Sequence, residues 1–177
     1  MRGFLSLDPD PTTRERLLIL QNRLRDALTR QGVHFAEPDR LAPVLLAWPF
    51  GRNDELEEAA ALLRGVSLPP TQSKPLEGRP NNDRPAEVGC GIFGLEELQA
   101  QLFDLLRATL DPDQPKEAFI RLVRISPPSR KVGIALRSSG LLGSDLGSFV
   151  PASITLWRQS PQGFEVCRTL SIADGRP

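Results

Sequence analysis

Apolar positions in the first third of the chain recur at two periods. Alternation predicts strands, whereas spacing of three to four residues predicts helices. Leucines at helical spacing over residues 17–28 predict a first helix. Thr12 and Glu15 have the spacing of a capping box at its start, and Gly32 is expected to end it. A second helix is predicted over residues 53–65. The expected extended segments cover residues 2–7, 32–38, 38–48 and 66–68.

A similar order returns in the second half of the chain. Residues 69–85 are rich in Pro, Asn, Gly and charge without periodicity, which indicates a mobile surface loop between two lobes. An amphipathic helix over residues 95–111, an Asp-Pro turn and an apolar strand over residues 118–125 then repeat the layout of the first lobe. Further strands are expected over residues 84–94, 131–137, 152–158 and 164–172, the last two joined by a hairpin turn. This alternation predicts an α+β domain with mixed or antiparallel sheets.

Length and charge narrow the class of protein. The 177 residues fit one domain, or two small lobes that share a core. Lys and Arg number 22 and so do Asp and Glu, so no global basic field exists to hold nucleic acid. No apolar stretch approaches the roughly 20 residues of a membrane span, and the N-terminus lacks the features of a signal peptide. We therefore expect a cytoplasmic protein that does not interact with membranes.

Cysteine and histidine are scarce, which limits the candidate chemistry. Cys90 and Cys167 lack the spacing of metal-binding pairs, and with a single histidine, His34, we expect no metal and no cofactor. Cys90 lies between two glycines, so a nucleophile activated by His34 is an alternative to a buried thiol. Residues 89–94, "GCGIFG", also match the dinucleotide-binding pattern, although we favour the explanation that these glycines let a strand turn sharply into a helix.

Two other features have ordinary structural explanations. Trp48 and Trp157 each lie at the end of an apolar strand, so both are expected to pack in the core. Residues 139–149, "SGLLGSDLGSF", carry repeated Gly-Ser spacing and leucines that we expect to be exposed. This segment is a flexible lip over a cleft, a docking loop, or a long connection without such a role.

Several segments together suggest a family. The phrases are "RGFLSL" at residues 2–7, "LQNRLR" at 20–25, "VHFAEPDRLAPVLL" at 33–46 and a closing hairpin at 153–172. They resemble "RLFVAL", "LQRRLR", "VRWVPPENLHLTL" and a "LYRS" to "YEVLARFPL" hairpin in the two-histidine phosphoesterases, the family of bacterial 2',5'-RNA ligases and cyclic phosphodiesterases. The resemblance implies a single bilobal domain over residues 1–177, with two pseudo-symmetric lobes around a central cleft.

The catalytic motifs of that family are missing. The resemblance implies two His-x-Thr or His-x-Ser motifs, in which one imidazole removes a proton and the other protonates the leaving oxygen. The chain has Ala42 and Val44 at the first motif and Ala118 and Ile120 at the second, and residues 115–125 contain neither histidine nor threonine. Because alternate residues of a strand share a face, we expect these positions to give the cleft an apolar lining.

The remaining candidates are ligand-binding residues. Arg40, Arg121, Arg124 and His34 lie on or beside the two motif strands, where arginines can hold an anion or simply face solvent. The sequence therefore favours a catalytically degenerate protein that binds a protein partner or a partly apolar small ligand. Residual RNA or nucleotide binding, or weak phosphodiesterase activity through other residues, is the alternative.

Overall fold

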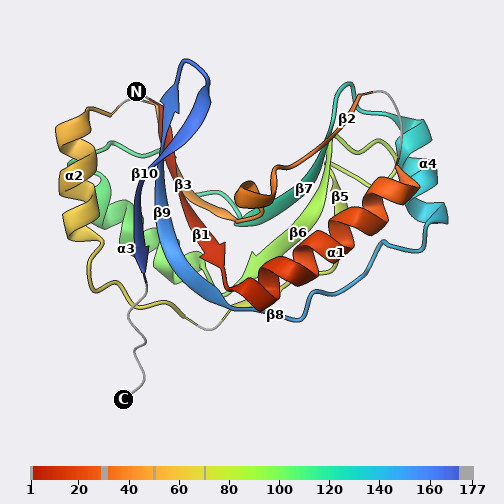
Figure 1. Ribbon diagram of the computed structural model, residues 1–177, viewed down its shortest axis with the longest axis horizontal. Coiled ribbons are helices and arrows are strands. Elements are labelled where there is room, and N and C mark those ends of the chain that lie inside the picture. Colours follow the sequence, from red (N-terminus) through yellow and green to blue (C-terminus); the bar gives the residue numbers. More distant parts are fainter. Residues whose placement is uncertain (1, 29–31, 50, 70, 172–177) are drawn as a thin grey trace.

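Two antiparallel sheets form the two lobes of the molecule (Figure 1). The computed structural model describes residues 2–28, 32–49, 51–69 and 71–171. The first sheet has the strand order β10-β9-β1-β3, with every neighbouring pair antiparallel. Its strands are β1 (Gly3–Pro9), β3 (Val44–Trp48), β9 (Pro151–Ser160) and β10 (Gly163–Ser171).

The second sheet has the order β2-β7-β6-β4-β8, and β5 also pairs with β6. Its central pair, β6 and β7, follows the same strand–helix–strand order as β1 and β3 of the first sheet. The strands are β2 (Val33–Phe35), β4 (Thr71–Ser73), β5 (Glu77–Arg79), β6 (Glu87–Phe93), β7 (Phe119–Ile125) and β8 (Ser148–Phe149).

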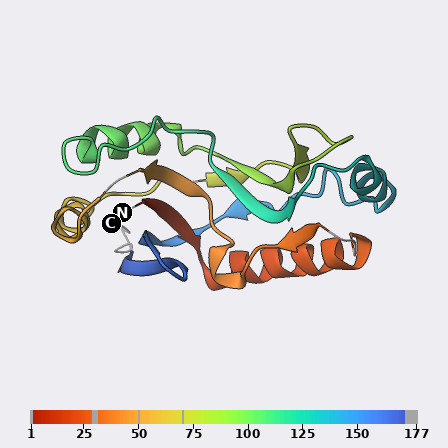
Figure 2. The ribbon, with the colours of Figure 1, turned by 90° about the horizontal axis from the view of Figure 1, so that it is seen from above.

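The two long helices cross between the lobes. Helix α1 follows β1 of the first sheet but packs against β7 and α4, whereas α3 follows β6 of the second sheet but packs against β3 and α2. Figure 2 shows α1 and α3 on opposite sides of the molecule. One buried apolar cluster runs through both lobes. The helices are α1 (Pro11–Ala27), α2 (Asn53–Leu62), α3 (Glu96–Leu106), α4 (Arg130–Ser138) and a short 3-10 helix, η1 (Pro38–Arg40).

The start of α1 differs from the predicted one. Asp10 is the N-cap, and its Oδ1 accepts a hydrogen bond of 2.7 Å from the backbone N–H of Thr13. Pro11 occupies the first helical position, where its missing N–H and fixed φ are tolerated, so the helix begins ahead of Thr12. The helix ends at Ala27, and the stretch at 29–31, before the predicted stop at Gly32, lies outside the described residues.

The predicted strand over residues 131–137 is wrong, because this segment is helix α4. Its buried residues, Val132, Gly133 and Leu136, follow helical spacing, and the helix packs against α1. Ser129 caps it by accepting a hydrogen bond from the N–H of Val132. Short segments with apolar residues at several spacings fit either period, and here packing against another helix decides the outcome.

Residues 69–85 do not form the expected structureless loop. They contain β4 and β5, and Leu76 between these strands is buried in the core. The predicted strand over residues 66–68 is absent from the described part of the chain. Residue 70 and the last residue of the predicted C-terminal strand, 172, lie outside the described residues.

The α+β class and the two-lobed arrangement around a cleft are confirmed. All strand pairs among the described residues are antiparallel. No helix in that part of the chain has the length and apolar character needed to cross a membrane.

Candidate functional site

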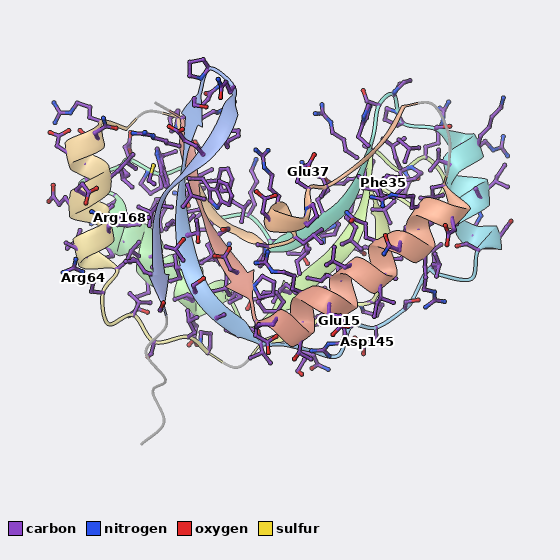
Figure 3. All side chains as sticks on the ribbon, in the orientation of Figure 1. Glu15, Phe35, Glu37, Arg64, Asp145 and Arg168 are labelled. Atoms are coloured by element: carbon purple, nitrogen blue, oxygen red, sulfur yellow. The ribbon has the colours of Figure 1, made fainter. Side chains whose placement is uncertain are left out.

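A pocket of about 720 Å³ lies between β3 of the first lobe and β7 of the second. In Figure 3, Phe35 and Glu37 lie on the chain that crosses from β2 to η1, along this groove. Aromatic and aliphatic side chains contribute to both walls, and charged side chains lie among them. The charged residues are Arg40, Arg79, Lys116, Arg121 and Arg124, with Glu37, Asp39, Glu87, Asp113 and Glu117.

The wall formed by β3 is apolar at its motif positions. Ala42 and Val44 both line the pocket, and the Val44 side chain is 41% exposed there. Ser6 of β1 pairs with Val44 in the sheet and also lines the pocket. At the place where the resemblance implies an imidazole and a hydroxyl, this wall therefore presents only two hydrocarbon side chains.

The predicted register of the second motif strand is wrong by one residue. Ala118 and Ile120 face the core and are buried, whereas Phe119 and Arg121 line the pocket. Core packing decides this, because Ile120 and Leu122 fill the interior beneath β7. The pocket is accordingly more polar on this wall than the expected apolar lining.

A bulge brings a second arginine to the same wall. In the pairing of β6 with β7, Gly89 lies opposite Arg121 and Val88 opposite Val123, so Leu122 is the extra residue. The alternation of sides shifts at this point, and Arg124 faces the pocket as Arg121 does, although the two are three residues apart.

Phe119 is held between a glycine and an arginine. A Cβ on Gly89 would lie 2.9 Å from two atoms of the Phe119 ring, so the glycine makes room for the ring to lie across β6. The guanidinium group of Arg79 lies over the Phe119 ring, with its central carbon 3.9 Å from the ring centroid. Arg79 also forms ion pairs with Glu77 at 2.7 Å and with Glu117 at 2.8 Å. The pocket wall formed by β7 thus carries an aromatic ring packed between Gly89 and Arg79.

Glu117 joins two cations at the rim of the pocket. Its Oε1 accepts from Lys74 Nζ, and its Oε2 accepts from Arg79. The hydrogen bond from Lys74 lowers the pKa of Glu117, and the charges of Arg79 and Lys74 add to this effect against the opposing effect of burial. Glu117 therefore stays ionised over a wider acidic range than an isolated glutamate.

Opposite charges form a row across the second sheet. His34 of β2 pairs with Arg124 of β7, which pairs with Glu87 of β6. Glu87 makes an ion pair of 2.7 Å with Arg121. The Arg124 side chain makes no hydrogen bond, ion pair or ring contact with any residue that the structure describes. Its guanidinium group, with donors and no acceptor, is available to an anion in the pocket.

Three aromatic rings form part of the opposite wall. Phe4 stacks on Trp157 at a centroid distance of 5.6 Å and meets Phe164 edge-on at 5.1 Å. Arg40 lies over Trp157 at 6.0 Å, and its Nη2 donates to the carbonyl of Phe164. Trp157 is buried, as predicted, yet it also lines the pocket, and its Nε1 donates to Ser6 Oγ at 2.9 Å.

The structure contradicts three alternative interpretations of the sequence. Cys90 is fully buried in the core, and burial raises its pKa to about 12, with Asp145 and Glu77 adding to the shift, so the thiol stays protonated. Gly89 and Gly91 lie within β6 of an antiparallel sheet, not at the turn of a dinucleotide site.

The third interpretation is a lip over the cleft formed by residues 139–149, but these residues do not border the pocket. A docking role for this segment stays a prediction. The described chain buries Leu141 and Leu146 there, contrary to the expected exposure. Arg16 of α1 donates to the carbonyls of Leu146 and Ser148, which ties this connection to α1. Trp48, like Trp157, is buried.

Sequence reasoning missed several charged residues of the pocket. Arg79 and Glu117 are 38 residues apart in the chain, and no local pattern connects them. Glu87 carries no local signal either, because its partner Arg121 is 34 residues away. Strand pairing alone brings these side chains together. Among the described residues, no group of three His, Cys, Asp or Glu side chains is arranged to hold a metal ion.

The pocket offers groups that can contact an anionic and partly aromatic ligand. The two walls supply aromatic faces, an unpaired guanidinium and one imidazole. General acid–base catalysis of a phosphoester transfer needs two groups that exchange protons on opposite sides of the phosphorus. The described pocket holds one imidazole, that of His34, and its other ionisable groups are the five carboxylates, the lysine and the four arginines named above.

Comparison with known proteins concerns the fold. No protein-family model and no curated protein matches the chain. Solved structures do match over nearly the whole length. TT0787 of Thermus thermophilus has a TM-score of 0.71 and 21% identity, covering 97% of each chain. E. coli LigT complexed with 3'-AMP has a TM-score of 0.61 and 17% identity, covering 98% of each chain.

A third structure, described as a phosphoesterase, has a TM-score of 0.55 and 16% identity, and covers 98% of this chain and 99% of that one. At these identities the likeness concerns the fold, and the fold agrees with the one that the resemblance to the two-histidine phosphoesterases predicts. This chain therefore has the bilobal α+β fold of LigT and related phosphoesterases.

Proposed function

We propose that this protein is a non-catalytic binding protein that holds a small ligand in the pocket between β3 and β7. The observation that carries the proposal is the set of four side chains that face each other across the pocket. Ala42 and Val44 on one wall and Phe119 and Arg121 on the other offer no imidazole and no hydroxyl. A phosphoester bound between these four side chains meets no pair of imidazoles to move its protons.

The pocket suits a ligand with an anionic group and an aromatic or apolar body. Its volume of about 720 Å³ lies within the usual range of small-molecule sites, about 300–1,000 Å³. Arg124 and His34 provide positive charge or hydrogen-bond donors at one wall, and Trp157 and Phe4 provide ring surface at the other. Formal charges in the pocket lining balance, with five basic side chains, Arg124 among them, and five acidic ones, which disfavours a long polyanion.

Absence of catalysis is tested directly. Purified protein is incubated with 2',3'-cyclic nucleotides and 2',5'-linked oligonucleotides, and the products are followed by chromatography. We expect no hydrolysis or ligation above a blank. Turnover that is abolished by His34→Ala, while Arg130→Ala leaves it intact, would contradict the proposal. Arg130 is a suitable control because it is exposed on α4 and does not line the pocket.

Ligand binding is tested with a panel of nucleotides and aromatic carboxylates by calorimetry. For any compound that binds, Arg124→Ala should weaken affinity roughly tenfold or more, because a hydrogen bond to a charged group contributes about 1.5–3 kcal/mol. Arg130→Ala should leave affinity unchanged. Equal effects of the two substitutions would place the compound outside the pocket and contradict the assignment.

Nucleotide or RNA binding is the second candidate. It is favoured by the structures of E. coli LigT, which are described as complexes with ATP, 3'-AMP and NADP+. In this chain Arg40, Arg121 and Arg124 would contact the phosphates. Titration of a short RNA at two salt concentrations tests this candidate, because phosphate contacts weaken steeply as salt rises. Binding that does not respond to salt, or no binding, would remove it.

A further inference from the structure

Two buried glutamines lie behind the pocket, one on each long helix. Gln21 of α1 is 2% exposed and Gln99 of α3 is 4% exposed. Each side chain uses one nitrogen, Nε2, to donate to two backbone carbonyls. An amide NH₂ has two hydrogens, so each carbonyl receives one of them and the donor capacity of the group is filled.

The four carbonyls belong to the strands and crossing segments that build the pocket. Gln99 donates to Leu45 of β3 at 2.8 Å and to Lys116, on the segment that enters β7, at 2.8 Å. Gln21 donates to Leu122 of β7 at 3.1 Å and to Ala36, on the segment that enters β3, at 2.9 Å. Gln99 thus connects β3 to the segment that enters β7, and Gln21 connects β7 to the segment that enters β3.

The arrangement is nearly the same in the two lobes. Leu45 directly follows Val44, and Leu122 directly follows Arg121, so both glutamines reach the residue after a pocket-lining motif position. A backbone hydrogen bond accompanies each amide, from Ala36 N to Leu122 O at 3.0 Å and from Asp113 N to Ala47 O at 2.8 Å. Two of the segments on which the chain passes between the lobes, the one ahead of β3 and the one ahead of β7, are therefore held in this way.

We propose that Gln21 and Gln99 are positioning residues that set the separation of the two pocket walls and keep the pocket open in one geometry. The crossing segments carry pocket residues themselves, among them Glu37 and Arg40 ahead of β3 and Glu117 ahead of β7. Loss of either amide removes one donor from each of two carbonyls and weakens the hold on the crossing segment, although the Leu122 carbonyl keeps its bond from Ala36 N. The effect on ligand binding rests on the proposed function, whereas the effect on wall separation does not.

The test measures wall separation without a ligand. Spin labels are attached at Gln162→Cys, in the hairpin between β9 and β10, and at Lys131→Cys on α4, two exposed positions on opposite lobes. Cys167→Ser removes the half-buried native thiol, and Cys90 is buried. Pulsed electron paramagnetic resonance then gives the distribution of distances between the labels.

We expect a narrow distribution for the parent protein and a broader or shifted one for Gln21→Met and Gln99→Met, with the largest change in the double variant. Methionine keeps the length of the side chain but cannot donate. Gln101→Met is the matched control, because Gln101 is exposed on the same helix as Gln99. A side chain that only adds stability would lower the melting temperature and leave the distance distribution unchanged, and that result would overturn the proposal.

Two further measurements keep the outcome decisive. If Gln99→Met loses its far-ultraviolet circular dichroism, Gln99→Asn replaces it, since it retains the amide on a chain one methylene shorter, and an unchanged distance distribution again overturns the proposal. In titrations with 3'-AMP, the Gln21→Met and Gln99→Met variants should bind roughly tenfold more weakly than the parent protein. This is the loss expected when a preorganised site is loosened. Failure of the parent protein to bind 3'-AMP would count against nucleotide binding alone, because the distances decide the role of the glutamines separately.

Discussion

At the scale of single residues, Glu117 shows how the pocket rim is held. Its carboxylate accepts from Lys74 and from Arg79, and Arg79 in turn covers the Phe119 ring. Each contact is partly exposed to solvent, so each contributes modestly to stability. Together these contacts mainly hold the Phe119 ring in place against the pocket wall.

Replacing Glu117 by Gln should reduce stability at neutral pH by less than about 1 kcal/mol, since solvent screens a half-exposed pair. The folded protein lowers the pKa of Glu117 below its ordinary value of 4.5, so its contribution is present above that value and is lost as pH falls through the folded pKa. Urea unfolding of the two proteins at several pH values should therefore converge at low pH. Glu15→Gln, on the outer side of α1, is the control, and a difference independent of pH would contradict this account.

Cys90 and Cys167 should differ sharply in reactivity. Burial raises the pKa of Cys90 to about 12, whereas Cys167 is only half-buried, although burial raises its pKa too. With a thiol reagent at pH 8, the native protein should lose one thiol slowly and the second only after denaturant is added. The Cys167→Ser variant should show almost no reaction while folded. Rapid modification of Cys90 in the native protein would disprove its place in the core.

At the scale of elements, the caps decide where the helices begin. The N-cap of α1 is Asp10, which accepts from Thr13 N at 2.7 Å. Asp10→Ala should destabilise the protein by about 1 kcal/mol, the typical value of a lost N-cap. Thr12→Ala, at the position where the sequence predicts the cap, should change the free energy of unfolding much less. Thermal or urea unfolding measures both, and equal losses would show that the cap does not act as described.

Element types were predicted well where one period was long and clear. The leucines of α1 and the alternation of β9 gave the right element because each pattern spans several turns or pairs. Shorter segments failed. Residues 131–137 became α4 because its buried face packs against α1, and residues 71–79 became β4 and β5 because β6 offered an edge for pairing.

At the scale of the whole molecule, the crossing of the helices joins the lobes. Helix α1 leaves the first sheet and packs against β7, and α3 leaves the second sheet and packs against β3. The second sheet is covered by α1, which follows a strand of the first sheet, and the first sheet is covered by α3, which follows a strand of the second. Neither sheet can therefore bury its apolar face without a helix from the other lobe. We propose that residues 1–177 behave as one domain, with the buried cluster as its common core.

Urea unfolding should accordingly show one cooperative transition. Tryptophan fluorescence reports the first sheet, where Trp48 and Trp157 lie, and far-ultraviolet circular dichroism reports both lobes. The two probes should give the same midpoint. A variant that weakens the second sheet moderately, such as Ile120→Val in the buried face of β7, should shift the midpoint of both probes together. Separate transitions would show that the lobes unfold independently.

The sequence by itself determined the α+β class, most of the long elements and the absence of a histidine pair. These features follow from periodicity and composition, which are properties of neighbouring residues or of the chain as a list. A pair of imidazoles cannot form in a chain with one histidine, whatever the register.

Only the tertiary structure decided what faces the pocket. The choice between Ala118 with Ile120 and Phe119 with Arg121 depends on which side of β7 packs against the core, and a shift of one residue exchanges the two sides. The bulge that turns Arg124 toward the pocket and the pairing of Arg79 with Glu117 arise between strands distant in sequence. Such contacts exist only when the sheets are assembled, which is why no local pattern predicted them.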